Sequence, residues 1–318
     1  MELEFLQDLD IKPKLPCIAK GIVKTLLYFD IFDYPLTEDE LYQFSDCKDL
    51  PYDEFHRELN ILADMGLISK KDKFIFMGTD LSKIASREKG NSLAAKYMKK
   101  AQKFSKIISF FPYVRGVYIS GSLSKGHVHE KGDIDYFIIT EPGRLWVARC
   151  MLVLFKKIFL LNSRKFFCLN YYIDSQSLEI PDQNIYTANE IVTLIPTYNY
   201  KLYLDLRTQN SWINEHYPHA TIKTPENVIP EGKIWISRVF EKLLSNDFGD
   251  RLDNYCFKLT LRFWKRKFNH FDESEFDHAL RSKKNISKHH PNRFQSRVLS
   301  AFNNKIKEFE KRNNLGIA

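Results

Sequence analysis

Two aspartates and a glycine-serine pair in the middle of the chain are the residues best suited to chemistry. Gly121 and Ser122 follow a short apolar run, and Asp133 and Asp135 lead into a second one. Runs rich in β-branched and aromatic residues and bounded by glycines form strands. Side chains two positions apart on a strand point to the same face, so we expect the two carboxylates side by side, about 6–7 Å apart along the backbone.

This pattern favours the chemistry of phosphate groups. Two neighbouring carboxylates at the edge of an apolar sheet repel each other and raise each other's pKa unless a positive charge compensates them. Mg²⁺ held by oxygen atoms is the usual solution, and the glycine turn can offer backbone N–H groups to a phosphate. The combination indicates phosphoryl or nucleotidyl transfer. The alternative is a glycine-containing loop before a strand whose acidic residues only face water.

The same residues resemble the DNA polymerase β-type nucleotidyltransferase superfamily. Its signature is an apolar strand, Gly-Ser, a gap and then acid–apolar–acid–apolar, here Asp133-Ile134-Asp135-Tyr136 after a ten-residue gap. The resemblance spans about 110–180. It implies a small mixed β-sheet flanked by helices, two Mg²⁺ ions held by Asp133 and Asp135, and attack of an acceptor hydroxyl on a nucleoside triphosphate with loss of pyrophosphate. Gly121 and Ser122 would then bind the triphosphate, and Lys125 would neutralise it.

The third carboxylate of that family has no clear counterpart in this chain. The next predicted strand runs from Lys165 to Asp174, and its mid-strand polar residue is Asn170, an amide that can bind a metal but cannot act as a base. Asp174, four residues further and therefore expected on the same face, is the substitute that we favour. Glu179 is a further alternative. The departure leaves a weak or inactive enzyme open.

Residues 1–79 are expected to form a separate module. Thr37 to Glu40 make a capping-box start for a second helix, Pro51 opens a third, and a hairpin of Leu67–Ser69 and Phe74–Phe76 follows. Three short helices and a hairpin resemble a winged helix-turn-helix. The third helix exposes mainly acidic side chains, whereas a helix entering a DNA groove should be basic. We therefore expect packing or partner contact here, not DNA binding.

The remaining chain completes an expected α+β architecture. A long helix over Asp80 to Phe111 leads into the nucleotidyltransferase core, 80–182, and 183–318 should form a C-terminal helical, basic domain. From Glu231 to Ala318 there are 19 Lys and Arg against 11 Asp and Glu, which equals the net charge of +8 of the whole chain. The basic side chains of this segment either form solvated surface or guide a polyphosphate or nucleic-acid acceptor toward the site.

The composition argues against membrane proteins, secreted proteins and proteins built around zinc or disulfides. The chain lacks a run of about twenty apolar residues, so we expect no membrane contact. The N-terminus is acidic and lacks a hydrophobic leader, which predicts a cytoplasmic protein. The five cysteines are scattered, which predicts reduced thiols without a zinc site or disulfide framework. Adjacent histidines do not face one metal, so His289 and His290 predict no zinc site; His290 is noted without a role.

Two functional hypotheses result. The first is an Mg²⁺-dependent nucleotidyltransferase that uses a nucleoside triphosphate and a small-molecule, protein or RNA acceptor. The second is a winged-helix regulatory protein with a nucleotide-sensing or degenerate nucleotidyltransferase domain. DNA affinity with a steep salt dependence would favour the second.

Overall fold

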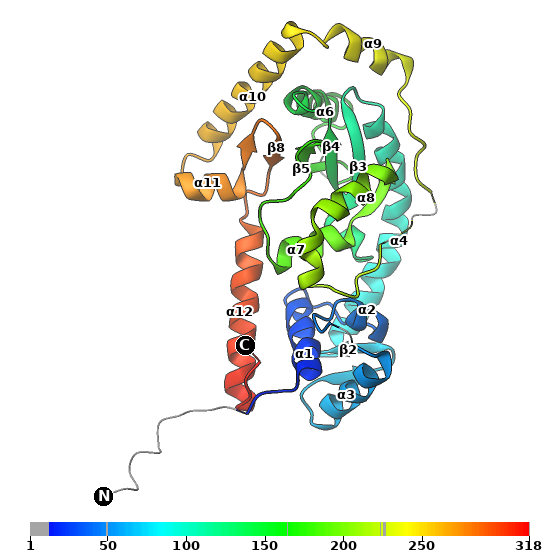
Figure 1. Ribbon diagram of the computed structural model, residues 1–318, viewed down its shortest axis with the longest axis vertical. Helices are drawn as coiled ribbons and strands as arrows, with labels where there is room; N and C mark the ends of the chain where they lie inside the picture. Colours follow the sequence, from blue (N-terminus) through cyan, green and yellow to red (C-terminus); the bar gives the residue numbers. More distant parts are fainter. Residues whose placement is uncertain (1–12, 49, 164, 223, 225–226, 318) are drawn as a thin grey trace, which may run out of the picture. The chain divides into compact units, whose positions relative to one another are not determined.

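The computed structural model describes residues 13–48, 50–163, 165–222, 224 and 227–317 of a mixed α+β chain (Figure 1). The chain divides into two compact units. The first contains Met1–Arg87, Asn214–Ala220 and Ser296–Ala318, and the second contains Glu88–Ile213 and Thr221–Gln295. The acidic N-terminal segment used in the argument about a leader lies outside the described residues, apart from its last two positions.

The first unit begins with the three helices and the hairpin that the sequence predicts. Its elements are α1 (Cys17–Asp30), α2 (Glu38–Gln43), α3 (Tyr52–Asp64), β1 (Ser69–Lys71) and β2 (Phe74–Phe76). Thr37 and Glu40 form the expected capping box, in which each side chain accepts a hydrogen bond from the other's backbone N–H. The first strand of the hairpin begins at Ser69, two residues later than predicted, and continues to Lys71 before a turn in which Asp72 has a positive φ of 53°. Asp53 and Glu54 of α3 are exposed.

The second unit is built around one six-stranded mixed sheet. Its strands are β3 (Val114–Ser120), β4 (Asp135–Thr140), β5 (Cys168–Asp174), β6 (Ile195–Tyr198), β7 (Ser282–Lys283) and β8 (Ile286–Lys288). Their order is β6-β3-β4-β5-β8-β7, and all neighbours are antiparallel except β4 and β5. Figure 1 shows β3, β4, β5 and β8 side by side.

Three of these strands come from the segment that was expected to be helical. β6 pairs with β3 at one side of the sheet, and β8 with β7 extends the other side beyond β5. These strands have two to four residues, too few for an alternating pattern to stand out in the sequence. The apolar residues on either side of Glu179 predict a further short strand at Leu178–Ile180, but that prediction is wrong, since the segment is irregular.

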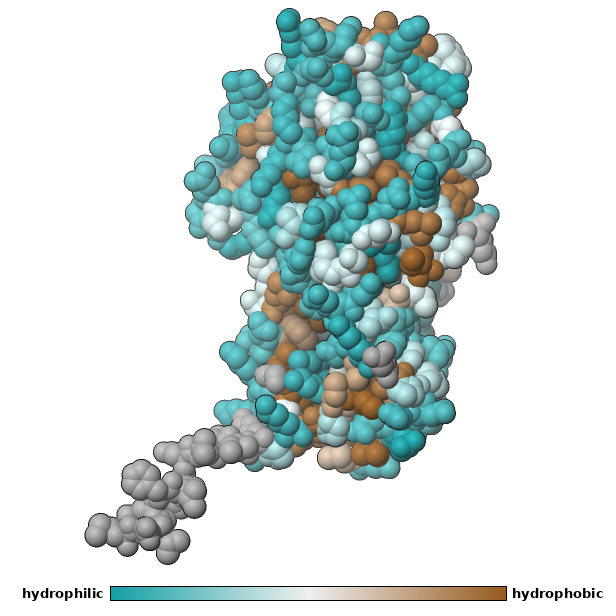
Figure 2. Space-filling model, in the orientation of Figure 1, coloured by the Kyte–Doolittle hydropathy of each residue, from teal (hydrophilic) through white to brown (hydrophobic). Residues whose placement is uncertain are grey.

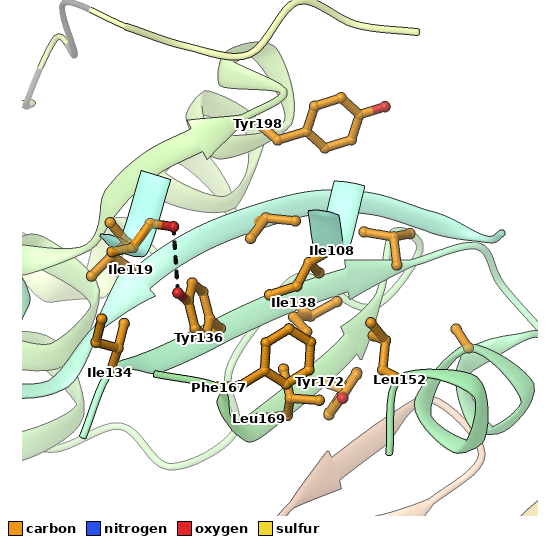
Figure 3. Close-up of a cluster of buried hydrophobic side chains, with 14 of the residues drawn as sticks. Ile108, Ile119, Ile134, Tyr136, Ile138, Leu152, Phe167, Leu169, Tyr172 and Tyr198 are labelled. Atoms are coloured by element: carbon orange, nitrogen blue, oxygen red, sulfur yellow. Dashed lines mark hydrogen bonds between the residues drawn. The ribbon is translucent and has the colours of Figure 1, made fainter. Parts of the chain in front are cut away.

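One face of the sheet holds the main hydrophobic core. Ile119, Tyr136, Ile138 and Leu169 pack there against α4 (Ser82–Ser109) and α6 (Leu145–Phe159). Figure 3 shows Tyr136 and Ile138 beside Phe167 and Tyr172. The Tyr136 hydroxyl donates to the carbonyl of Ala101, 3.3 Å away, which ties β4 to the long helix. This anchoring holds the strand that starts at Asp135.

The opposite face carries a row of aromatic rings. Tyr118, Phe137 and Tyr171 stack across β3, β4 and β5, and Tyr203 covers Tyr118 edge-on. Asp135 lies on this face, two positions before Phe137.

The other helices are α5 (Gly121–Ser124), α7 (Ile185–Thr193), α8 (Tyr200–Gln209), the 3-10 helix η1 (Ser211–Glu215), α9 (Trp235–Leu243), α10 (Asp247–Lys267), α11 (Glu273–Ala279) and α12 (Phe294–Asn313).

Helix α9 packs a polar side chain against the start of β3. Its Glu241 accepts hydrogen bonds from the Tyr113 backbone N–H at 2.7 Å and from the Arg115 guanidinium at 2.9 Å, while Trp235 is 73% exposed. Figure 2 shows other hydrophobic residues scattered among hydrophilic ones on the visible face. The ion pair fixes the start of β3, the strand that leads into the turn at Gly121. Among the described helices, none combines the length and apolar character needed to cross a bilayer.

A glycine in α4 positions the loop between the two predicted halves of the site. Gly90 is buried, its carbonyl accepts from Val128 N–H at 3.3 Å, and a Cβ at this position would overlap the His127 ring. A helix-interior glycine costs about 1 kcal/mol relative to alanine, so its presence is explained by this close approach.

We therefore expect Gly90→Ala to destabilise the protein despite the better helix propensity. Because the new methyl group meets a packed ring, the free energy of unfolding should fall by about 1–3 kcal/mol. Urea unfolding measures it, with Ser92→Ala at an exposed position of the same helix as the control. Equal or higher stability of Gly90→Ala would contradict this account of the loop.

Candidate functional site

The turn after β3 is shaped by the carboxylate that faces it. Gly121 opens α5 with a φ of +69°, a conformation that favours glycine. Ser120 lies opposite Asp135 in the antiparallel register, and a Cβ on Gly121 would overlap the Asp135 carboxylate. The sequence analysis reserved this space for a ligand, whereas the structure shows that the Asp135 side chain itself requires it. The Ser122 carbonyl closes the turn by accepting from the N–H groups of Lys125 and His127.

The structure brings Asp133 and Asp135 together, and it adds a thiol. β4 begins at Asp135, so Asp133 lies just before the strand. Cys168 faces Asp135 across the parallel β4–β5 pair. The carboxylate oxygens and the Cys168 sulfur all lie within 4.8 Å of one another. Sequence analysis placed Cys168 on the right strand but missed its role, because only the strand register puts it opposite Asp135.

Burial and mutual repulsion dominate the electrostatics of this cluster. Burial, then the charge of Asp133, raises the pKa of Asp135 to about 7; Glu190 adds to the rise, and the Cys168 hydrogen bond and Lys125 oppose it. Burial and the two aspartates also raise the pKa of the Cys168 thiol far above its ordinary value. The thiol therefore stays protonated at neutral pH and adds no further negative charge to the pair.

Asn170 holds Asp135 through a β-bulge. Its side-chain N–H₂ donates to Asp135 Oδ1 at 2.5 Å, and its Oδ1 accepts from the Cys168 thiol at 3.2 Å. Across the strand pair, Tyr136 is paired with Leu169 and Phe137 with Tyr171, so Asn170 is the extra residue. The residue that the resemblance would align with a third carboxylate is thus a hydrogen-bond partner of Asp135.

Asp174 does not join the pair, and the expectation that it shares the facing of Asn170 is wrong. Its partner on β4 is Thr140, at the opposite end of that strand from Asp135 and an odd number of residues away. The bulge at Asn170 inserts one residue, so a four-residue spacing no longer keeps a side chain on one face. Asp174 instead accepts from the Gln176 N–H at 3.1 Å. Glu179 is exposed.

A third carboxylate reaches the turn from α7, a helix to which the sequence analysis assigned no functional residue. Glu190 of α7 accepts from the Lys125 ammonium at 2.8 Å and lies 3.4 Å from the Gly121 backbone nitrogen, which donates to it. Lys125 also donates to the Gly121 carbonyl at 3.2 Å. A carboxylate therefore lies where the sequence analysis expects a phosphate, and it pairs with the lysine expected to neutralise that phosphate. The residues are 65 positions apart, so no local signal links them.

Two further titratable groups near these carboxylates, Tyr186 and His290, are neutral at pH 7. Burial raises the pKa of Tyr186 well above its ordinary value, and Glu190 and Asp135 add to the rise. Burial, followed by Lys288, lowers the pKa of His290 to about 4, against the effect of Glu190. His290, noted in the sequence without a role, packs edge-on against Tyr171. Neither side chain offers the cation that the carboxylates lack.

The donor set suits a hard divalent cation. Carboxylate oxygens are the ligands that Mg²⁺ prefers, and Asp133 and Asp135 present theirs close together at the end of a rigid strand. Asn170 directs its nitrogen toward Asp135, so it adds no oxygen on that side. The residues fit one cation between the two aspartates.

No protein-family model, curated protein or solved structure matches this chain. The site therefore has to be interpreted from its own geometry.

Replacing the buried carboxylate tests this electrostatic account. A carboxyl whose pKa is higher in the folded than in the unfolded state loses stability as pH rises from about 4 to 7. We expect Asp135→Asn to match the wild type at pH 4.5 and to exceed its free energy of unfolding by about 1–4 kcal/mol at pH 8 without metal.

Denaturant unfolding in EDTA at the two pH values measures the effect, and the exposed Glu179→Gln serves as the control. A variant that is less stable than the wild type at pH 8 would show that the Asp135 charge is already compensated.

Proposed function

We propose that the protein is an Mg²⁺-dependent nucleotidyltransferase that moves a nucleoside monophosphate from a nucleoside triphosphate to a hydroxyl of an acceptor. The observation that carries the proposal is the placement of Asp133 and Asp135, whose carboxylates converge beside the Gly121 turn and repel each other there. Carboxylates that bind a metal beside a backbone turn that can face phosphate are what transfer from a triphosphate needs.

Metal binding and the orientation of the metal ligands would involve different side chains. Asp133 and Asp135 would hold Mg²⁺, which supplies charge neutralisation and polarises the phosphate when bound. Asn170 keeps Asp135 oriented by donating to it, and Cys168 holds Asn170 by donating to its Oδ1. The two-ion arrangement of the family would need a further oxygen ligand, since Asn170 supplies an amide at the third position.

Lys125 and the Gly121–Ser122 turn would bind the triphosphate. For that, Lys125 must exchange its ion pair with Glu190 for one with a phosphate oxygen, and both anions favour the same ammonium. The exchange is feasible because the Lys125 and Glu190 side chains are 18% and 27% exposed, so water can solvate both during the change. The acceptor class, whether small molecule, protein side chain or RNA end, is left open.

A specific observation favours a second candidate, a domain that binds a nucleotide without transferring it. Asn170 replaces a carboxylate at the third family position, and Glu190 lies beside the Gly121 N–H in the expected phosphate position. Both features would lower turnover while leaving the two aspartates able to bind Mg²⁺. Such a domain next to a winged-helix-like module would suit a regulatory protein.

Pyrophosphate release separates the two candidates. With Mg²⁺, each of the four labelled nucleoside triphosphates and a cell extract as acceptor pool, we expect release with at least one nucleotide. The Asp133→Ala/Asp135→Ala variant should reduce it by roughly a thousandfold, since both metal ligands are lost. Glu179→Gln is the matched control. Mg²⁺-dependent nucleotide binding without pyrophosphate release would favour the nucleotide-binding domain. If the wild type shows neither nucleotide binding nor pyrophosphate release, both candidates are wrong.

The competition for Lys125 gives a second test. Because Glu190→Gln removes the resident anion, we expect the triphosphate to bind roughly three- to tenfold more tightly without metal, as for a partly exposed ion pair worth about 1 kcal/mol. Lys125→Ala should weaken binding. Isothermal titration calorimetry measures both. If Glu190→Gln leaves affinity unchanged but abolishes transfer, Glu190 acts as a catalytic carboxylate instead.

A further inference from the structure

Two cysteines of the first unit lie in contact, away from the aspartates. Cys17 is the first residue of α1, and Cys47 lies in the loop after α2. Their sulfur atoms are 3.5 Å apart. Cys17 is exposed, whereas Cys47 is only 8% exposed. One thiol is therefore open to solvent, and the other lies directly behind it.

A glycine allows this approach. Gly21 follows Cys17 by one helical turn, so both lie on the same side of α1. A Cβ on Gly21 would lie 2.7 Å from Asp46 Oδ1 and 3.6 Å from Cys47 Cβ. Glycine inside a helix costs about 1 kcal/mol relative to alanine, and here it leaves room for the loop to lie against the helix.

The loop is held in that place from both ends. Thr25 of α1 donates to the Phe44 carbonyl at 3.0 Å, and Tyr42 donates to the Leu50 carbonyl at 2.8 Å. The His219 Nε2 atom lies 2.7 Å from the Cys47 carbonyl oxygen. The two sulfur atoms are thus neighbours because of contacts on each side of Cys47.

We propose that Cys17 and Cys47 form an oxidation site, at which a hydroperoxide converts the two thiols into an intramolecular disulfide. The Cys17 sulfur attacks the terminal peroxide oxygen, the O–O bond breaks, and a sulfenic acid and an alcohol (or water) form. The Cys47 sulfur then attacks the Cys17 sulfur, the S–O bond breaks, and the hydroxyl leaves as water with the Cys47 proton. Two thiols lose two electrons, and one peroxide gains them.

The order of the two steps follows from exposure. The peroxide reaches Cys17 first because that side chain faces solvent. Burial and the neighbouring Cys17 raise the pKa of Cys47 to about 11, so Cys47 remains a thiol until the sulfenic acid forms beside it. Closing the bond needs the sulfur atoms to approach from 3.5 Å to about 2.05 Å, which a loop and the first turn of a helix can accommodate.

Peptide mapping tests the proposal on the full-length protein. After treatment with one equivalent of hydrogen peroxide and alkylation, trypsin releases 15–20 with Cys17 and 25–48 with Cys47. We expect these two peptides linked and two hydrogens lighter than their sum, and separated again by dithiothreitol. Cys17→Ser should abolish the link. The oxidised protein should also unfold at a temperature several degrees higher, because the bond closes a loop in the unfolded chain.

Gly21→Ala tests the geometric basis separately. The added methyl group should displace the 45–47 loop and lower the yield of linked peptide several-fold, while circular dichroism shows that the helices remain. The proposal is overturned if peroxide leaves Cys47 free and carries Cys17 on to the sulfinic acid, or if linked peptides join Cys17 to other cysteines. Cys150 and Cys256, which contact each other in the second unit, are scored in the same digest.

Discussion

Burying the Asp135 carboxylate beside Asp133 at the start of β4 costs electrostatic free energy. The residues at the centre of the second unit are arranged around this carboxylate. Asp135 is packed against a turn that only glycine fits and is held by an amide on a bulged strand. Moving a carboxylate from water into such surroundings raises its pKa, and Asp133 adds to the rise. The fold maintains this charge through the anchored strands β3, β4 and β5. A site that is unfavourable for the empty protein and favourable with a cation is what metal binding requires.

The neighbours of the pair preserve the imbalance. Cys168 and Tyr186 stay protonated, so neither the thiol nor the phenol changes the charge, while the lysine nearest the turn is engaged by Glu190. The turn at Gly121 therefore has a positive group, Lys125, and a negative pair, Asp133 and Asp135, close to it. On the proposed function, a cation between Asp133 and Asp135 would lower their repulsion of a polyphosphate, and a polyphosphate at Lys125 would in turn attract the cation. Metal and nucleotide would then bind more favourably together than either would alone.

Local patterns predicted much of the fold. The helices of the first unit, the hairpin, α4 and the strands on either side of the Gly-Ser turn follow from caps, breakers and periodicity, which act within a few residues. The strands β6, β7 and β8 could not be predicted in this way. Each is short and takes its place from backbone pairing with β3 or β5, so its partner lies far away in the sequence. An expected helical domain therefore contributes three strands to the same sheet as the aspartates.

The site shows the same limit at the scale of single residues. Asp133, Asp135 and Gly121 belong to one short segment, and their juxtaposition could be argued from strand periodicity. Asp174 was placed by that periodicity too, but one inserted residue at Asn170 reverses the facing of everything after it, and nothing in the side-chain pattern marks a bulge. Glu190 depends on the docking of a whole helix. Periodicity therefore holds up to the first irregularity, and beyond it the position of a functional group is a property of the tertiary structure.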